Sequence, residues 1–256
     1  MKNAGGSVVV VGTDTDILVM LVAHATPELD LYMLCSHKPK TIYRINDIKQ
    51  SLGDISQSLP FLHAVTGCDT TSAMYNKGKL KAFKLAQGNK NLASQMNVFI
   101  QPNSTHEEIR EAGEAFILSL YGARGYKTLD KYRHIAYKRA VARTSKKAAF
   151  NLASLPPTSA AAHQHLYRVY LQTQEWLGNG LDPTAWGWEK TEVSLIPIPT
   201  DKPPAPKKLV NFISCACKKG CKKNCSCRTA GIQCSEVCIN CLESPCNNMP
   251  DIDFDE

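Results

Sequence analysis

The sequence predicts an α/β protein that carries a small cysteine-rich module at its carboxyl end. Three observations predict this class. Residues 7–11 are an uninterrupted β-branched run that ends at Gly12, and an apolar segment over residues 17–23 follows it. Amphipathic patterns of helical period fill the middle of the chain. Nine of the eleven cysteines fall within the last 42 residues.

Composition places the chain among ordinary α/β proteins rather than membrane proteins or secreted ones. No stretch approaches the about 18 uninterrupted apolar residues that a membrane span needs. The first apolar run is interrupted by Asp14 and Asp16 and has no cleavage-site pattern, so we expect no secretory signal and a reducing compartment. The formal net charge is +7, and residues 124–147 hold nine Lys or Arg against the single Asp130. This excess indicates an anionic partner or, alternatively, a solvated helix face.

The first element, residues 7–11, is expected to be a strand buried on both faces of a parallel sheet, followed by a helix capped by Thr or Asp. Asp14 and Asp16 would then lie at the carboxyl end of the strand, where ligand sites of such sheets form. Two carboxylates in such a loop supply half of a divalent-metal site, because Mg²⁺ prefers hard oxygen ligands. Taken alone, the Asp-Thr-Asp element is more typical of a turn and helix cap. A third acid, Asp69, follows in Thr66-Gly67-Cys68-Asp69-Thr70-Thr71.

The ordered pair of the Thr13-Asp14-Thr15-Asp16 and Gly67-Cys68-Asp69 elements resembles PIN-like nucleases of the flap-endonuclease class. The resemblance implies that Asp14, Asp16 and Asp69 are catalytic ligands of Mg²⁺ or Mn²⁺. It further implies that Lys77, Gly78 and Lys79 form a glycine-centred turn that contacts phosphates. The chain resembles more closely a group of transposon-associated invertebrate proteins that join such a nuclease-like region to a cysteine-rich tail, and residues 156–158 and 181–188 carry the same likeness.

The chain also departs from this family pattern, in a way that bears on activity. A two-metal site for phosphodiester cleavage, with its ions about 4 Å apart, normally takes more than three carboxylates. The family supplies further acids upstream of the element that contains Asp14, and this sequence has none there. We therefore expect an incomplete PIN-like region of impaired activity, whose sheet exposes a long apolar edge.

Three helices are predicted for the middle of the chain. The first begins with a capping box at Ser104-Thr105-His106-Glu107, the second spans residues 129–143, and the third opens at residues 158–160 and ends near Trp176. Three histidines in these helices are expected to be exposed or to act as caps rather than to bind metal: His134, His163 and His165. Three tryptophans are expected to anchor residues 178–195 onto the helices, with stacking on bases as the alternative: Trp176, Trp186 and Trp188.

These elements suggest five segments. An incomplete nuclease-like region with a helical extension covers residues 1–150, and a helix with a Trp-rich connector covers residues 151–195. The Pro-rich stretch at residues 196–208 is expected to be an extended linker. A zinc-cluster domain follows at residues 209–248, and an acidic tail at residues 249–256 ends the sequence.

The cysteine-rich segment is too short and too poor in large apolar side chains to fold without a cross-link. Zinc is favoured over disulfides, because the expected compartment is reducing and because nine cysteines cannot all pair. Three tetrahedral ions need twelve sulfur positions, which nine cysteines supply if three of them bridge two ions each. The predicted ligands of about three structural Zn²⁺ ions are Cys215, Cys217, Cys221, Cys225, Cys227, Cys234, Cys238, Cys241 and Cys246.

The segment Cys225-Ser226-Cys227-Arg228-Thr229-Ala230-Gly231-Ile232-Gln233-Cys234 resembles the centre of the tesmin-type CXC domain, a zinc cluster that binds DNA in several members. The resemblance implies a DNA partner and, from it, a nuclear location. The basic side chains expected to meet DNA are Lys218, Lys219, Lys222, Lys223 and Arg228. Residues 201–246 have a formal charge of +5, and nine thiolates with three Zn²⁺ ions reduce it by three, so the loaded module is only mildly basic. A purely structural zinc knot, a non-catalytic DNA-binding remnant and a protein-interaction scaffold remain alternatives.

Overall fold

The structure is a computed structural model that describes residues 6–36, 39–143 and 151–202. In the carboxyl-terminal part it describes residues 215, 217, 221, 222, 225–229, 234, 238, 241 and 246–248. The chain divides into two compact units, Met1–Asp201 and Lys202–Glu256. The predicted mixed α/β class with a cysteine-rich cluster is confirmed, whereas the PIN-like identity of the fold stays a prediction.

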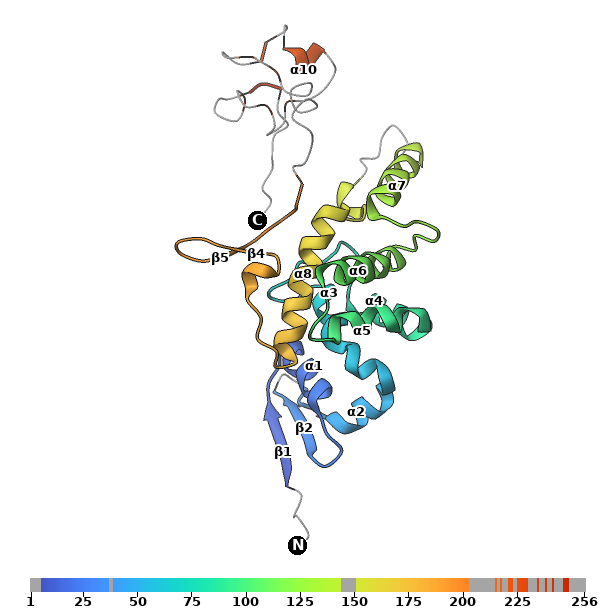
Figure 1. Ribbon diagram of the computed structural model, residues 1–256, viewed down its shortest axis with the longest axis vertical. Helices are drawn as coiled ribbons and strands as arrows, with labels where there is room; N and C mark the ends of the chain where they lie inside the picture. Colours follow the sequence, from blue (N-terminus) through green and yellow to red (C-terminus); the bar gives the residue numbers. More distant parts are fainter. Residues whose placement is uncertain are drawn as a thin grey trace. The chain divides into compact units, whose positions relative to one another are not determined.

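The first unit opens with a three-stranded sheet of order β1-β2-β3 (Figure 1). Strand β1 (Ser7–Val11) pairs in parallel with β2 (Asp30–Cys35), and β2 pairs antiparallel with β3 (Thr41–Arg44). Helix α1 (Thr15–His24) makes the crossover from β1 to β2, and Asp14 caps it by accepting from the backbone N–H of Asp16 at 3.0 Å. The predicted strand and the capped helix after it are both present.

One face of this sheet is covered and the other is open. Helices α1 and α2 (Ile45–Leu52) bury Leu31 and Met33 of β2 in a small core. On the opposite face, the register sets Val9 beside Tyr32, and Val11 beside Leu34. The prediction that the first strand is buried on both faces was wrong, because β1 lies at the sheet edge and leaves Val9 and Val11 56% and 64% exposed. The predicted apolar edge is present.

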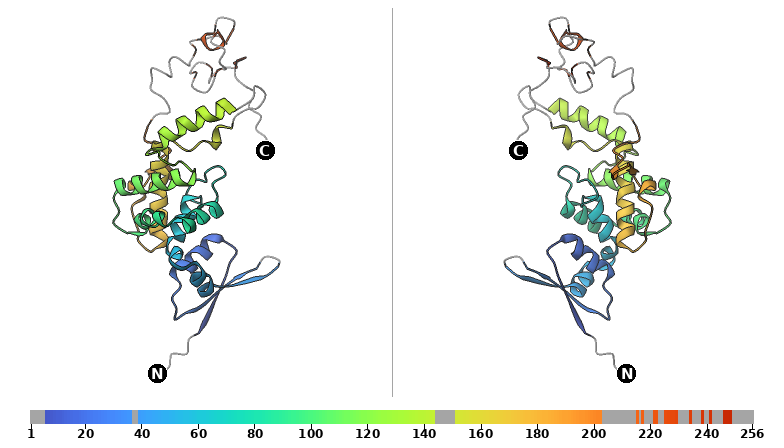
Figure 2. Two further views of the ribbon diagram at one scale, coloured as in Figure 1. Left: turned by 90° about the vertical axis from the view of Figure 1, so that its right-hand side faces the viewer. Right: turned by 90° about the vertical axis from the view of Figure 1, so that its left-hand side faces the viewer.

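The rest of the unit is a helical bundle. Its elements, in chain order, are η1 (Gly53–Ser58), α3 (Leu59–Val65), α4 (Lys79–Gly88), η2 (Lys90–Leu92), α5 (Ala93–Ile100), α6 (His106–Leu120), α7 (Leu129–Arg143), η3 (Leu152–Ser154) and α8 (Ser159–Trp176). Figures 1 and 2 show α8 running along the other helices, and it contacts α3, α5 and α6. All three predicted helices are present. The capping box of α6 forms one residue later than predicted, between Thr105 and Glu108.

An aromatic cluster forms the centre of the bundle. The rings of Phe61 and Phe99 lie 4.3 Å apart between centroids, and Phe116 meets Phe61 edge-on at 5.0 Å. Helices α6 and α8 approach each other closely at Gly113, where an added Cβ would lie 2.4 Å from the side chain of Leu166. Only glycine fits there, since a methyl group would force α8 away from the cluster.

The structure divides the chain differently from the predicted segments. Helix α8 is part of the bundle core, so residues 151–201 belong to the same unit as the sheet. The predicted linker begins inside a hairpin, because β5 (Leu195–Pro197) pairs with β4 (Trp188–Lys190) after η4 (Pro183–Ala185). The backbone N–H of Ile198 then donates to the carbonyl of Gly187 at 3.0 Å. Residues 203–208 of that linker and the acidic tail at 249–256 lie outside the described residues.

The structure contradicts the expected exposure of one histidine in the bundle and confirms the expected packing of a tryptophan. His165 is buried rather than exposed, and its Nε2 lies 3.2 Å from the carbonyl oxygen of Val65. His163 is half-buried beside Glu114, with 3.4 Å between Nε2 and Oε2. Trp186 stacks on His106 with ring centroids 4.4 Å apart, which fixes the irregular segment onto the helices as expected. None of the helices that the structure describes is long and apolar enough to cross a membrane.

Candidate metal centre and lysine-rich turn

The cysteines of the second unit form one cluster of sulfur atoms. Seven of the nine are buried, and Cys217 and Cys246 are half-buried at its border. Short backbone turns hold them: helix α10 (Ser226–Thr229) follows Cys225 directly, and the N–H of Cys234 donates to the carbonyl of Asn248 at 2.7 Å. These turns bring the sulfur atoms around a common centre.

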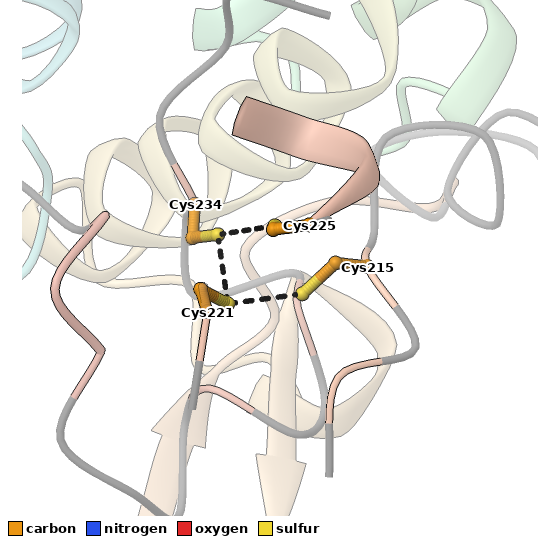
Figure 3. A group of neighbouring side chains, drawn as sticks. All are labelled: Cys215, Cys221, Cys225 and Cys234. Carbon is orange, nitrogen blue, oxygen red and sulfur yellow. Dashed lines mark hydrogen bonds between the residues drawn. The ribbon is translucent and has the colours of Figure 1, made fainter. Parts of the chain in front are cut away.

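Distances between the sulfurs distinguish metal binding from cross-linking. Neighbouring Sγ atoms lie 3.4 Å apart for Cys215 and Cys221, 3.6 Å for Cys221 and Cys234, and 3.9 Å for Cys225 and Cys234 (Figure 3). A disulfide would bring two sulfurs to about 2.05 Å. Two thiolates on one tetrahedral zinc, each about 2.3 Å from the ion, lie about 3.8 Å apart. The spacing therefore fits zinc ligands.

Three sets of four cysteines, each with sulfurs within 4.8 Å of one another, could hold a metal ion. The sets are Cys215, Cys221, Cys225 and Cys234; Cys215, Cys227, Cys234 and Cys238; and Cys221, Cys234, Cys241 and Cys246. Cys234 belongs to all three, and Cys215 and Cys221 belong to two each. Eight cysteines therefore supply the twelve ligand positions that three ions need, because three of the eight are shared between sets. Cys217 is in none of the sets. The cluster is compatible with zinc binding.

The environment of the thiols lowers the pKa of some of the predicted ligands and raises that of others, and three of them illustrate this. The backbone N–H of Cys217 is the largest influence on Cys215 and lowers its pKa to about 6. A hydrogen bond from the backbone of Arg228 likewise lowers the pKa of Cys225. Burial dominates at Cys227 and raises its pKa to about 12. Because zinc binds the thiolate, the first two positions would accept an ion most readily, while Cys227 would have to lose its proton on binding one.

Two of the predicted DNA-contacting side chains of this module are described. Lys222 and Arg228 are exposed, and the Arg228 guanidinium donates to the carbonyl of Asn247 at 3.4 Å. The other three, Lys218, Lys219 and Lys223, lie outside the described residues. Lys222 and Arg228 therefore lie on the surface of the cysteine cluster.

The structure places the three predicted catalytic acids in different settings. Asp14 is exposed and caps α1, and Asp69 is exposed in the loop after α3. The Asp16 carboxylate, by contrast, is paired with His63, with 2.5 Å between Oδ1 and Nε2. Across the described parts of the chain, the groups of at least three side chains that could hold a metal are all made of cysteines. A Mg²⁺ or Mn²⁺ site at these acids stays a prediction.

His63 was not singled out from the sequence. It is the polar side chain of an otherwise apolar helix, Leu59–Val65, and it stands 47 residues from Asp16. The one feature of the sequence that could have indicated a role for His63 is its position shortly before the Gly-Cys-Asp element. The ring of Trp176 lies 5.6 Å from it between centroids, so a bundle residue also positions it.

Lysines gather at the turn before α4 and in the first turns of that helix. A hollow of about 590 Å³ lies over it, lined by Asn76, Gly78, Lys79, Leu80, Lys81 and Lys84. Partial burial and the neighbouring ammonium of Lys81 lower the pKa of Lys77 to about 8. Lys77 Nζ also lies 4.2 Å above the ring of Tyr121, and Lys79 Nζ donates to the carbonyl of Gly67 at 2.7 Å. The predicted phosphate-contacting turn is therefore an ordered, cationic surface.

The Gly-Cys-Asp loop supports this turn. Gly67 has a φ of 107°, and a Cβ at that position would lie 2.9 Å from Ala73, so the loop requires glycine. Cys68 and Thr71 form an isolated bridge with both backbone bonds at 3.2 Å, and the hydroxyl of Thr70 donates to Gln172 of α8 at 2.5 Å. The loop thus fixes the carbonyl that holds Lys79.

Comparisons of the chain with protein-family models, with curated proteins and with solved structures find no match.

Proposed function

We propose that the protein binds nucleic acid through the lysine-rich turn of its first unit and the zinc module of its second. The observation that carries the proposal is the set of four lysines at the start of α4: Lys77, Lys79, Lys81 and Lys84. None of the ion pairs within the described residues involves these lysines. Like charges held together without acids are unfavourable, and a row of phosphates relieves that repulsion.

The second unit supports the same proposal. Zinc at the three cysteine sets would hold the module folded and so keep Lys222 and Arg228 on an ordered surface. With three ions bound, residues 201–246 carry a charge near +2, which on its own favours weak binding. From the resemblance to CXC domains we infer that the partner of this module is DNA. A nuclear location belongs to the same proposal.

A second candidate is a nuclease that depends on Mg²⁺ or Mn²⁺, with Asp14, Asp16 and Asp69 as ligands. The exposed carboxylates of Asp14 and Asp69 favour it, since both are open to a hydrated ion. The pairing of Asp16 with His63 opposes it, because one ligand oxygen is already in use. We therefore place binding first and regard cleavage as ancestral.

Binding and cleavage are tested with the zinc-loaded chain on labelled single-stranded, duplex and 5′-flap DNA in Mg²⁺ or Mn²⁺. We expect binding that weakens as salt is raised, and that weakens further in the Lys77→Ala/Lys81→Ala variant. Lys190→Ala, a change of an exposed lysine in β4, is the matched control. Binding equal in the double variant and the control would overturn the role of the turn. Absence of any DNA binding at moderate salt would favour a protein-interaction scaffold instead.

Cleavage is scored in the same reactions with Asp14→Ala and Asp69→Ala. Products that depend on the divalent ion and disappear in either variant would establish the second candidate. Binding without products is the expected result, and it would identify the nuclease-like region as a binding surface.

A further inference from the structure

A cavity of about 300 Å³ lies where α1, α3 and α4 meet. Its walls are apolar and include Val19 of α1, Leu62 of α3 and Phe83 of α4. Polar atoms reach it from Thr15, His63 and Lys79. The volume is at the small end of ligand sites and matches a single flat ring system with its substituents.

His63 is the buried polar group of this cavity, with 5% of its surface exposed. The Asp16 carboxylate lies 2.5 Å from Nε2 and favours the tautomer in which Nε2 donates to it. Nδ1 is then an acceptor, and it has no partner among the described residues. A carboxylate that holds one nitrogen of an imidazole leaves the other oriented toward a ligand.

Positive charge collects at the rim. Thr15 and Lys79 are the first residues of α1 and α4, which are ten residues each, so the amino ends of two helices meet there. No side chain caps α4, because Gly78 occupies the N-cap position. One of the three N–H groups of the Lys79 ammonium donates to the carbonyl of Gly67, which leaves two N–H groups for a ligand. Two carboxylates lie near this rim: Asp16 is directed to His63, and Asp14 caps α1 by accepting from the backbone N–H of Asp16.

We propose that this cavity takes one nucleotide of a single-stranded nucleic acid, which rests on the proposed function and names its substrate class. The base lies against Phe83 and the apolar walls, and a donor of the base or sugar meets Nδ1 of His63. The phosphate lies at the rim, on Lys79 and the amino end of α4, next to the lysine-lined hollow that receives the neighbouring phosphates. A paired and stacked base of a duplex cannot enter such a cavity, whereas an unstacked one can.

The test compares two leucines of the zinc-loaded full chain. Leu80 borders the cavity and is 66% exposed, while Leu152 in η3 is 59% exposed and distant from it in the fold, so both tolerate a larger side chain. Leu80→Trp obstructs the cavity and is expected to weaken binding of a short single-stranded DNA about tenfold, the effect of losing one stacked base. Leu152→Trp is expected to leave the binding of both DNAs unchanged. Because Leu80 also lines the lysine-rich hollow, Leu80→Trp is expected to weaken single-stranded binding more than duplex binding.

A second measurement needs no variant. The ¹⁵N resonance of His63 Nδ1 is followed while single-stranded DNA is added to the unaltered chain, and it is expected to shift as the nitrogen accepts a hydrogen bond. If single-stranded DNA binds while this resonance stays in place and Leu80→Trp binds normally, the cavity proposal fails and the proposed function stands. If neither single-stranded nor duplex DNA binds, both fail.

Discussion

The buried imidazole of His165 makes the stability of the first unit depend on pH. Its Nε2 meets the carbonyl of Val65, and its Nδ1 is buried without a partner among the described residues. Burial therefore disfavours the protonated ring and lowers the pKa to about 4, against an ordinary 6.5, with the charge of Arg168 acting in the same direction. The unfolded chain takes up the proton at a higher pH than the folded chain does.

The magnitude follows from this difference in pKa. Above pH 6.5 neither state is protonated, and the full stability is present. As the pH falls from 6.5 toward 4, the unfolded state gains the proton first, and stability is lost. The loss is about 2 kcal/mol at pH 5 and reaches about 3 kcal/mol below the folded pKa. This is a large part of the stability of an ordinary domain.

Urea unfolding of the zinc-loaded chain at pH 7 and pH 5, followed by tryptophan fluorescence, measures this loss. All three tryptophans lie in the first unit, so zinc release from the second does not contribute directly to the signal. His165→Gln is the control, because its side-chain amide can still donate to Val65 but does not titrate. Other groups, including Glu114 with its lowered pKa, affect both proteins alike. Equal losses of stability in the two proteins would refute the reasoning.

Three further predictions concern the metal, the bundle and the sheet. Cys234→Ser should lower the zinc content per chain, measured by elemental analysis, more than Cys217→Ser does, because Cys234 is in all three four-cysteine sets and Cys217 is in none. Gly113→Ala should destabilise the first unit by about 1 to 3 kcal/mol in urea unfolding, since its methyl group has no room, whereas Gly88→Ala, with open space around it, should not. Val9→Lys should reduce concentration-dependent association, measured by light scattering, because a charge on an exposed edge strand opposes pairing with a second chain; unchanged scattering would contradict this.

Elements that depend on nearby residues were predictable from the sequence. The helices over residues 129–143 and 159–176 have the expected bounds, and the start of α6 follows from the local exchange between Thr105 and Glu108. The cysteine cluster was predictable for a related reason: a short polar segment with nine cysteines has few ways to fold other than around a metal ion. The predicted contact of the tryptophan segment with the helices also rested on composition alone.

Features that depend on distant parts of the chain were not predictable. Whether a valine run is a central or an edge strand is decided by its neighbours in the sheet, and β1 has a neighbour on one side only among the described strands. His165 is buried because α3 lies against α8, a contact between residues about a hundred positions apart. The hairpin of β4 and β5 was hidden by its prolines, which an edge strand tolerates.

The pairing of Asp16 with His63 connects the two candidate functions. The Oδ1 atom of Asp16 is paired with His63, so a divalent ion at that atom competes with the imidazole, while Oδ2 is left for an ion. A hydrogen bond to a charged group contributes about 1.5 to 3 kcal/mol, so an ion that displaced His63 from Oδ1 would bind about ten- to a hundredfold more weakly. The same bond orients the free nitrogen of His63 at the cavity. The contact that would weaken a metal site at Asp16 is thus also part of the proposed nucleotide site, which is why we place binding before cleavage.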